Sequence, residues 1–270
     1  MEEEKSMNQI IGLIEEFGKL QQVSAIALGG SRGTHTEDKD SDYDLYMYVT
    51  EEIDLSDRKR ILEKYCNYLE LGNDFWELED DCRLNSGTII EIIYRRIEDL
   101  DEQLEVQLYD GQAGCGYTTC MWYNLLNSII LYDKYNTLKM LVEKYSLPYP
   151  EQLRKNIIQK NLRLLDNNIP SFNYQIEKAA KRGDMVSINH RIAAFLASYF
   201  DIIWAINKKA HPGEKRLITL CKEKCSKLPT DFEVNLNVLL SAGNNTDIIM
   251  KQVHSLNTNL IKLLVQEKLV

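Results

Sequence analysis

The chain has 270 residues, of which 44% are hydrophobic and 27% charged, as in an ordinary folded globular protein. Its 13 glycines and 5 prolines are too few for a disordered or low-complexity chain. The net charge of −9 argues against a protein that grips nucleic acid mainly through the phosphates. At about 150 residues per domain, the length predicts one large domain or two modest ones.

The charge is distributed unevenly along the chain. Residues 1–147 carry 14 Lys/Arg against 30 Asp/Glu, whereas residues 148–270 carry 18 against 11. Such asymmetry predicts two regions with different roles. The first residues are acidic where an export signal would be basic and then apolar, and the longest uncharged run is too polar to span a membrane. We therefore expect a cytoplasmic protein that does not enter a membrane.

Helical and strand patterns alternate in the first half of the chain. Apolar residues recur at helical spacing over 9–20, and a second helix is expected over 56–71. Short apolar, β-rich runs predict strands over 23–28, 43–49, 88–94 and 128–132. The pattern therefore predicts an α/β domain with a small mixed sheet over residues 1–147.

The second half shows only helical periodicity. Pro148 and Pro150 mark a plausible boundary. Beyond it, helical patterns cover residues 150–166, 172–182, 185–208, 214–227, 231–241 and 246–267. We expect a C-terminal all-α helical bundle over residues 148–270.

The stretch that points to chemistry begins where the first predicted strand ends, with Gly29-Gly30-Ser31-Arg32. The two glycines allow a tight turn and close approach of the backbone to a ligand. Ser31 offers a hydroxyl and a backbone N–H, and a helix starting there would turn further N–H groups toward an anion. Arg32 either contacts a triphosphate or is solvated.

Carboxylates follow at a spacing that suits a metal ion. Asp42 and Asp44 alternate at the start of a strand, so that both side chains point to one face. Two close carboxylates repel each other unless a cation lies between them, and oxygen-only ligands favour Mg²⁺. Glu91, among isoleucines on a later strand, is the candidate third carboxylate. Its rivals are Glu77, Glu79, Asp80 and Asp81.

The order Gly30-Ser31, ten residues, Asp42-x-Asp44 and then a carboxylate at Glu91 resembles the nucleotidyltransferase superfamily with the polymerase-β-type fold. The match is to its small-molecule branch, the aminoglycoside and lincosamide nucleotidyltransferases. The signature covers residues 27–49 and 91 only, and the helical second half fits the usual layout of that family.

The resemblance implies a Mg²⁺-dependent transferase that moves AMP from ATP, or another nucleoside monophosphate, to a hydroxyl of a small molecule. It further implies an aminoglycoside- or lincosamide-type antibiotic as the acceptor and a role in antibiotic resistance. It places the phosphates against Gly30 and Ser31 and the metal on Asp42, Asp44 and Glu91. Glu91 would be a metal ligand, the general base, or both. Lys215, in the basic second half, is predicted to reach the β- or γ-phosphate across a cleft between the domains. Oligomeric state is not readable from the sequence.

Two alternatives stay open at this point. The protein could adenylylate a protein side chain, as antitoxin-type members of the superfamily do, or it could be a non-catalytic nucleotide sensor on the same fold. The acceptor and the choice of nucleotide leave no local sequence signature.

Overall fold

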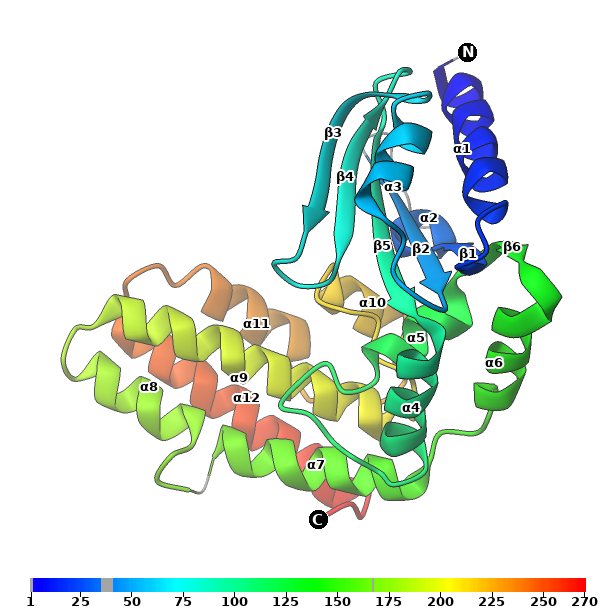
Figure 1. The fold of residues 1–270 in the computed structure, drawn as a ribbon. Helices are drawn as coiled ribbons and strands as arrows, with labels where there is room; N and C mark the ends of the chain where they lie inside the picture. The colour runs from blue at the N-terminus through cyan, green and yellow to red at the C-terminus, as the bar shows by residue number, and fades with distance from the viewer. Residues whose placement is uncertain (1, 35–40, 167) are drawn as a thin grey trace. The chain divides into compact units, whose positions relative to one another are not determined.

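A computed structural model describes residues 2–34, 41–166 and 168–270 (Figure 1). The chain divides into two compact units. The first, which we call the sheet unit, comprises residues 1–104 and 124–147, and the second, the helical unit, comprises residues 105–123 and 148–270. The predicted domains and these units differ in the segment 105–123. Each unit is described by itself.

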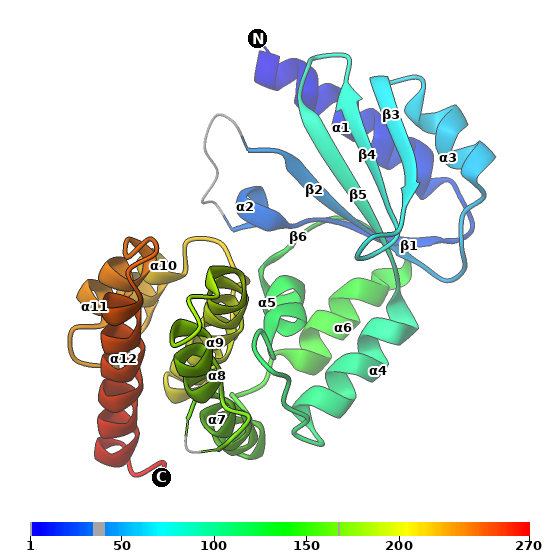
Figure 2. The ribbon, with the colours of Figure 1, turned by 90° about the vertical axis from the view of Figure 1, so that its left-hand side faces the viewer.

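The sheet unit contains one six-stranded mixed sheet, as predicted (Figure 2). The strand order is β3-β4-β5-β2-β1-β6, with β2 and β5 parallel and the other neighbouring pairs antiparallel. The strands are β1 (Val23–Leu28), β2 (Tyr43–Val49), β3 (Cys66–Asn73), β4 (Glu79–Leu84), β5 (Ile89–Arg96) and β6 (Ile129–Asp133).

One face of this sheet carries the hydrophobic core. Helices α1 (Glu2–Gly18) and α3 (Leu55–Leu62) contribute buried residues to the same cluster as alternate residues of β2 and β5. Leu45 and Ile92 are among the buried strand residues. Because successive strand side chains point to opposite faces, the residues between them point away from this core. Asp44 and Glu91 therefore lie on the other face of the sheet.

The prediction of one helix over residues 56–71 is wrong in its second half. The helix α3 ends at Leu62, and the chain then forms the edge strand β3. Cys66, Leu69 and Leu71 pack against the core, so burial in β3 favours a strand over the weak helical pattern. The sequence also left β4 unpredicted, along with the helices α2 (Gly30–Gly33), α4 (Ile97–Leu108), α5 (Cys120–Asn127) and α6 (Thr137–Tyr145) and the 3₁₀ helix η1 (Lys134–Asn136).

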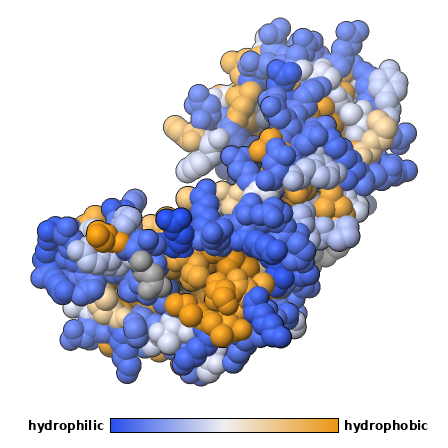
Figure 3. Space-filling view, turned by 90° about the horizontal axis from the view of Figure 1, so that it is seen from below, coloured by the Kyte–Doolittle hydropathy of each residue, from blue (hydrophilic) through white to orange (hydrophobic). Residues whose placement is uncertain are grey.

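The helical unit is built around α9 (Met185–Ile206), whose last two turns are buried on all sides. A helix that is apolar all round is expected in the centre of a bundle. The other helices of residues 148–270 also follow the predicted segments: α7 (Glu151–Leu165), α8 (Phe172–Ala180), α10 (Leu217–Lys224), α11 (Phe232–Leu240) and α12 (Thr246–Gln266). Figure 3 shows a group of hydrophobic side chains on one face of this unit.

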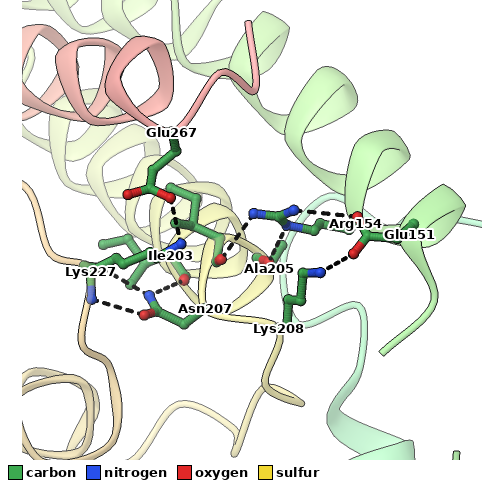
Figure 4. Close-up of polar contacts among 9 residues, drawn as sticks. Glu151, Arg154, Ile203, Ala205, Asn207, Lys208, Lys227 and Glu267 are labelled. Carbon is green, nitrogen blue, oxygen red and sulfur yellow. Dashed lines mark hydrogen bonds and ion pairs between the residues drawn. The ribbon is translucent and has the colours of Figure 1, made fainter. Parts of the chain in front are cut away.

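Side chains from neighbouring segments satisfy the free carbonyl groups at the C-terminal end of α9 (Figure 4). Arg154 donates to the carbonyl oxygens of Ala205 and Ile206, at 3.2 Å each. Asn207 donates to the carbonyl oxygens of Ile203 and Lys227, at 2.9 Å each, and its amide oxygen accepts from the Lys227 backbone N–H. These bonds fix the end of the central helix.

A buried carboxylate explains why residues 105–123 belong to the helical unit. Asp201 of α9 accepts hydrogen bonds from the Thr118 backbone N–H at 3.0 Å and from the Thr118 hydroxyl at 2.6 Å. Asn161 of α7 donates to the same carboxylate at 3.1 Å.

No helix of the described residues is long and apolar enough to cross a bilayer.

Candidate active site

The turn after β1 needs glycine at two consecutive positions. Gly30 has φ of +56°, and a Cβ there would overlap the carboxylate of Asp44. A Cβ on Gly29 would overlap the ring of Tyr46, and the Gly29 N–H donates to the Asp44 carbonyl oxygen at 2.8 Å. The turn is therefore pressed against β2, and the backbone of Gly30 lies directly beside the Asp44 carboxylate.

The helix that begins at Gly30 is short. It ends at Gly33, after four residues, and therefore has little of the macrodipole that a longer helix would direct at an anion. The Thr34 hydroxyl donates to the carbonyl oxygens of Gly30 and Ser31, at 3.1 and 3.2 Å, and so closes the turn. Ser31 lies in this turn as predicted, and its contact with a phosphate stays a prediction.

Arg32 connects the turn to the segment that carries the first aspartate. Its Nε donates to the Asp42 carbonyl oxygen at 3.0 Å, and its Nη2 donates to the Ser41 carbonyl oxygen at 2.8 Å. The guanidinium carbon lies 4.0 Å from the centroid of the Tyr43 ring. This geometry gives Arg32 a positioning role at Asp42, and nucleotide contact by Arg32 stays a prediction. His35 and Asp40 lie outside the described residues.

The predicted carboxylates meet across the parallel strand pair. Asp44 on β2 and Glu91 on β5 are register partners, and Asp42 immediately precedes β2. Directly paired strand residues point to the same face with their Cβ atoms about 5 Å apart. On its other side, Glu91 is paired with Asp81 of β4. Three neighbouring strands therefore bring three acidic residues into one row.

The structure distinguishes among the other candidates for the third carboxylate, which are Glu77, Glu79, Asp80 and Asp81. Asp80 lies in the core, where its carboxylate accepts from Arg58 at 2.8 Å and from the Tyr94 hydroxyl at 2.8 Å. Glu77 accepts two hydrogen bonds of 2.7 Å from Arg95. Of the four rivals, Asp81 and Glu79 lie on β4 positions that share the face of Glu91. Asp80 and Glu77 thus have structural partners, whereas Asp81 extends the acidic row.

The electrostatic environment of Glu91 is unusual for a carboxylate. Burial raises its pKa to about 7, with further contributions from the charges of Asp42, Asp44, Asp81 and Glu79. Burial and the nearby charges of Asp81 and Glu77 also raise the pKa of Glu79. The raised pKa of Glu91 means that its negative charge lacks compensation in the protein alone.

This uncompensated charge fits a hard divalent cation. Among the described residues, no three His, Cys, Asp or Glu side chains are already arranged as a complete metal cluster. The available groups are nevertheless all oxygen donors, and burial together with the charges of the other carboxylates raises the pKa of Glu91. Mg²⁺ is commonly held by one or two carboxylates together with substrate phosphates, so a complete protein cage is not required.

Tyr46 and Arg95 support the site and were not predicted. The guanidinium carbon of Arg95 lies 4.2 Å from the centroid of the Tyr46 ring, and that ring packs beneath Gly29. The bidentate pair with Glu77 holds Arg95 in this position. Strand alternation could have placed Tyr46 on the same face as Asp44. No local pattern links Tyr46 to an arginine on another strand.

Lys215 belongs to the helical unit. It is exposed and lies between His211 and the start of α10. The six other predicted site residues, Gly30, Ser31, Arg32, Asp42, Asp44 and Glu91, all belong to the sheet unit. Contact of Lys215 with a triphosphate stays a prediction.

Comparison with known proteins gives one partial family match. A protein-family model described as "Domain of unknown function (DUF4037)" matches residues 121–217, which is less than half of the chain. This match includes Lys215 and none of the other predicted site residues. No curated protein matches the chain.

Solved structures to which the chain is similar are nucleotidyltransferase-like proteins. A nucleotidyltransferase-like protein from Exiguobacterium sibiricum 255-15 has a TM-score of 0.44 at 12% identity, covering 94% of this chain and 72% of that one. An aminoglycoside 6-adenyltransferase from Bacillus subtilis has a TM-score of 0.31 at 11% identity, covering 98% of this chain and 91% of that one. The Thermotoga maritima CCA-adding enzyme, complexed with tRNA(CCA), has a TM-score of 0.31 at 11% identity, covering 97% and 82%. Likenesses this distant carry no argument about chemistry.

Proposed function

We propose that this protein is a Mg²⁺-dependent nucleotidyltransferase that transfers AMP from ATP to a hydroxyl group of a small molecule. The observation that carries the proposal is the pairing of Asp44 with Glu91 across β2 and β5, beside Asp42 and against the backbone of Gly30. This arrangement places acidic oxygen donors next to a turn that a phosphate can approach closely.

The proposed reaction is a substitution at the α-phosphorus of ATP. The oxygen of the acceptor hydroxyl forms a bond to this phosphorus, and the bond from the α-phosphorus to the bridging oxygen of pyrophosphate breaks. The hydroxyl proton goes to the carboxylate of Glu91, which lies beside Asp44 on the same face of the sheet. Pyrophosphate leaves with the electron pair of the broken bond.

Asp42, Asp44 and Glu91 are the proposed holders of the metal. When bound, Mg²⁺ supplies neutralisation of the triphosphate charge and steadies the attacking and leaving oxygens. Gly30 and Ser31 are proposed to bind phosphate through the turn, and Arg32 holds the Asp42 backbone in place. Lys215 is proposed to contact the β- or γ-phosphate as a compact cation.

Pyrophosphate release tests this proposal. The purified protein is incubated with ATP and Mg²⁺ alone and with a panel of hydroxyl-bearing acceptors, including aminoglycosides, lincosamides and simple metabolites. We expect release with one acceptor class and none with Asp44→Asn. Asp57→Asn, on the exposed surface of α3, is the matched control and should retain full activity.

The panel also separates the proposal from its alternatives. Silence across all small acceptors, combined with a mass increase of one AMP on a protein incubated with the enzyme and ATP, would favour a protein acceptor. Tight binding of ATP without pyrophosphate release from any acceptor would favour a nucleotide sensor. Equal release by the wild type and Asp44→Asn would contradict the proposed chemistry.

A further inference from the structure

A pocket of about 370 Å³ lies within the helical unit, in the size range of small-molecule sites in proteins. Three helices, α9, α10 and α11, supply most of its lining residues. These walls are apolar and include Leu196, Phe200, Leu217, Ile218, Leu236 and Leu240. Polar groups enter its lining only at Tyr117, Glu214, Arg216 and Thr219.

The segment that carries Tyr117 is held rigidly against α9. A Cβ on Gly116 would come within 2.8 Å of the Ala197 Cβ, so only glycine permits this approach. Thr118 is bound through its backbone and hydroxyl to the buried carboxylate of Asp201. Between these two anchors, Tyr117 adopts a φ of +54°, which is strained for a residue with a side chain.

A second strained residue lines the same pocket. Arg216, which precedes α10, has a φ of +54°. Residues held in such conformations cluster at ligand-binding sites, because the surrounding structure must impose them. Tyr117 and Arg216, two of the described non-glycine residues with a positive φ, therefore line the same pocket.

The charges near Tyr117 favour a cation. Burial raises the pKa of Tyr117 and of Cys120, and the nearby charge of Glu214 raises both further, with Asp201 also acting on Cys120. His211, whose ring centroid lies 5.1 Å from that of Tyr117, brings no compensating charge because burial lowers its pKa to about 3. Tyr117 is 40% exposed. An aromatic face beside a carboxylate is a favourable environment for an ammonium group.

We propose that this pocket binds a small amphipathic amine. Its apolar body packs against α9, α10 and α11, and its ammonium group lies between the Tyr117 ring and the Glu214 carboxylate. All the lining residues of this pocket belong to the helical unit, and the proposed amine binding does not require Asp42, Asp44 or Glu91. Lys215, for which we propose contact with the triphosphate, lies between the lining residues Glu214 and Arg216.

Calorimetric titration of the full-length protein with three matched probes tests the proposal. The probes are 4-phenylbutylamine, 4-phenylbutanol and 4-phenylbutyrate, which share an apolar body and differ in the charge of the polar end. At neutral pH we expect the amine to bind roughly tenfold more tightly than the alcohol, because a hydrogen bond to a charged group adds more than about 1.4 kcal/mol. The carboxylate should bind more weakly than the alcohol.

Two variants locate the binding. Glu214→Gln, an exposed position, should reduce the affinity for the amine to that for the alcohol and leave the alcohol unchanged. Ala193→Trp, which places a large side chain on the pocket wall, should abolish binding of both. Glu223→Gln, an exposed glutamate of α10 outside the pocket lining, is the charge-matched control and should behave as the wild type.

Several results would overturn the proposal. These are the absence of binding by all three probes, equal affinity for amine and alcohol, or undiminished amine binding by Glu214→Gln or Ala193→Trp. Tighter binding of the carboxylate than of the amine would also overturn it, and would assign the polar end of the pocket to Arg216.

Discussion

Asp44 and Glu91 face each other across the parallel pair of strands β2 and β5, as direct register partners. One of them lies against the Gly30 backbone, and the other has its pKa raised to about 7 by burial and by neighbouring carboxylates. The pair therefore combines close access to a ligand with an uncompensated negative charge.

Gly30→Ala tests the close approach at the turn. The new Cβ would displace the Asp44 carboxylate, and we expect nucleotidyl transfer to fall about 100-fold, as a small misplacement of a catalytic group commonly causes. Gly72→Ala is the matched control, since Gly72 also has a positive φ, of +74°, but has no atom within 4 Å of the added Cβ. The control should lose about 1 kcal/mol of stability and keep its activity. Equal activity in the two variants would contradict this role of Gly30.

Glu91→Gln tests the coupling between protonation and metal binding. Because the Glu91 carboxyl loses its proton near pH 7, the affinity of the wild type for Mn²⁺, measured by electron paramagnetic resonance, should rise between about pH 6 and about pH 8. The Glu91→Gln variant should bind Mn²⁺ more weakly and show little of this rise. Glu98→Gln, an exposed position on α4, should retain the wild-type profile. A pH-dependent rise that persists in Glu91→Gln would assign the titration to another group.

Asp80→Asn tests the view that this carboxylate is structural. Arg58 and Asp80 are both buried, and removing the negative partner leaves a buried guanidinium without compensation. We expect a loss of about 3–5 kcal/mol in the free energy of unfolding. Tyr94→Phe, which removes only the hydroxyl that donates to Asp80, should cost about 1.5–3 kcal/mol. Urea denaturation measures both, and a neutral effect of Asp80→Asn would contradict the assignment.

Asp201 should make the stability of the helical unit dependent on pH. Burial raises the pKa of Asp201 from 3.8 to about 6, although hydrogen bonds from Thr118 and Asn161 act in the opposite direction. Between these two values the folded protein holds a proton that the unfolded chain has released. The free energy of unfolding should therefore fall as the pH rises from about 4 to about 6.

Asp201→Asn removes this titration. The difference in unfolding free energy between the wild type and this variant, from urea denaturation followed by circular dichroism, should change over the same pH interval. Asp247, at an exposed position in α12, provides the control. The difference in unfolding free energy between the wild type and Asp247→Asn should be constant over this pH interval. If the difference in unfolding free energy between the wild type and Asp201→Asn is constant with pH, this result contradicts the raised pKa of Asp201.

Local sequence patterns predicted the strands and helices whose buried residues recur at regular spacing. The strands β1 and β2 begin and end at the predicted residues, and the helices α7 to α12 lie within a few residues of their predicted ends. These segments have strong periodicity or clear punctuation by glycine and proline. The helix predicted over 56–71 was wrong beyond Leu62 because the edge strand β3 is stabilised by its antiparallel pairing with β4, the next strand along the chain, and by burial of Cys66 in the core.

The candidate site was predictable to the extent that it is local. Gly30, Ser31, Asp42 and Asp44 lie within one short stretch, whereas Glu91 required a guess at which strand lies beside β2. The pairing of the strands shows that the neighbour of β2 that carries Glu91 is β5. The support of Gly29 by Tyr46 and Arg95 depends on contacts between strands, which no local pattern encodes.

The most direct test of the central claim follows the label of ATP. The wild type, Asp42→Asn and Asp44→Asn are incubated with Mg²⁺, the acceptor panel and ATP labelled on either the α- or the γ-phosphate. We predict that the wild type transfers the α-label to an acceptor and releases the γ-label in pyrophosphate. Both variants should leave the α-label on ATP and release no labelled pyrophosphate. Transfer of the γ-label to the acceptor, or unchanged α-label transfer in either variant, would contradict nucleotidyl transfer at these aspartates.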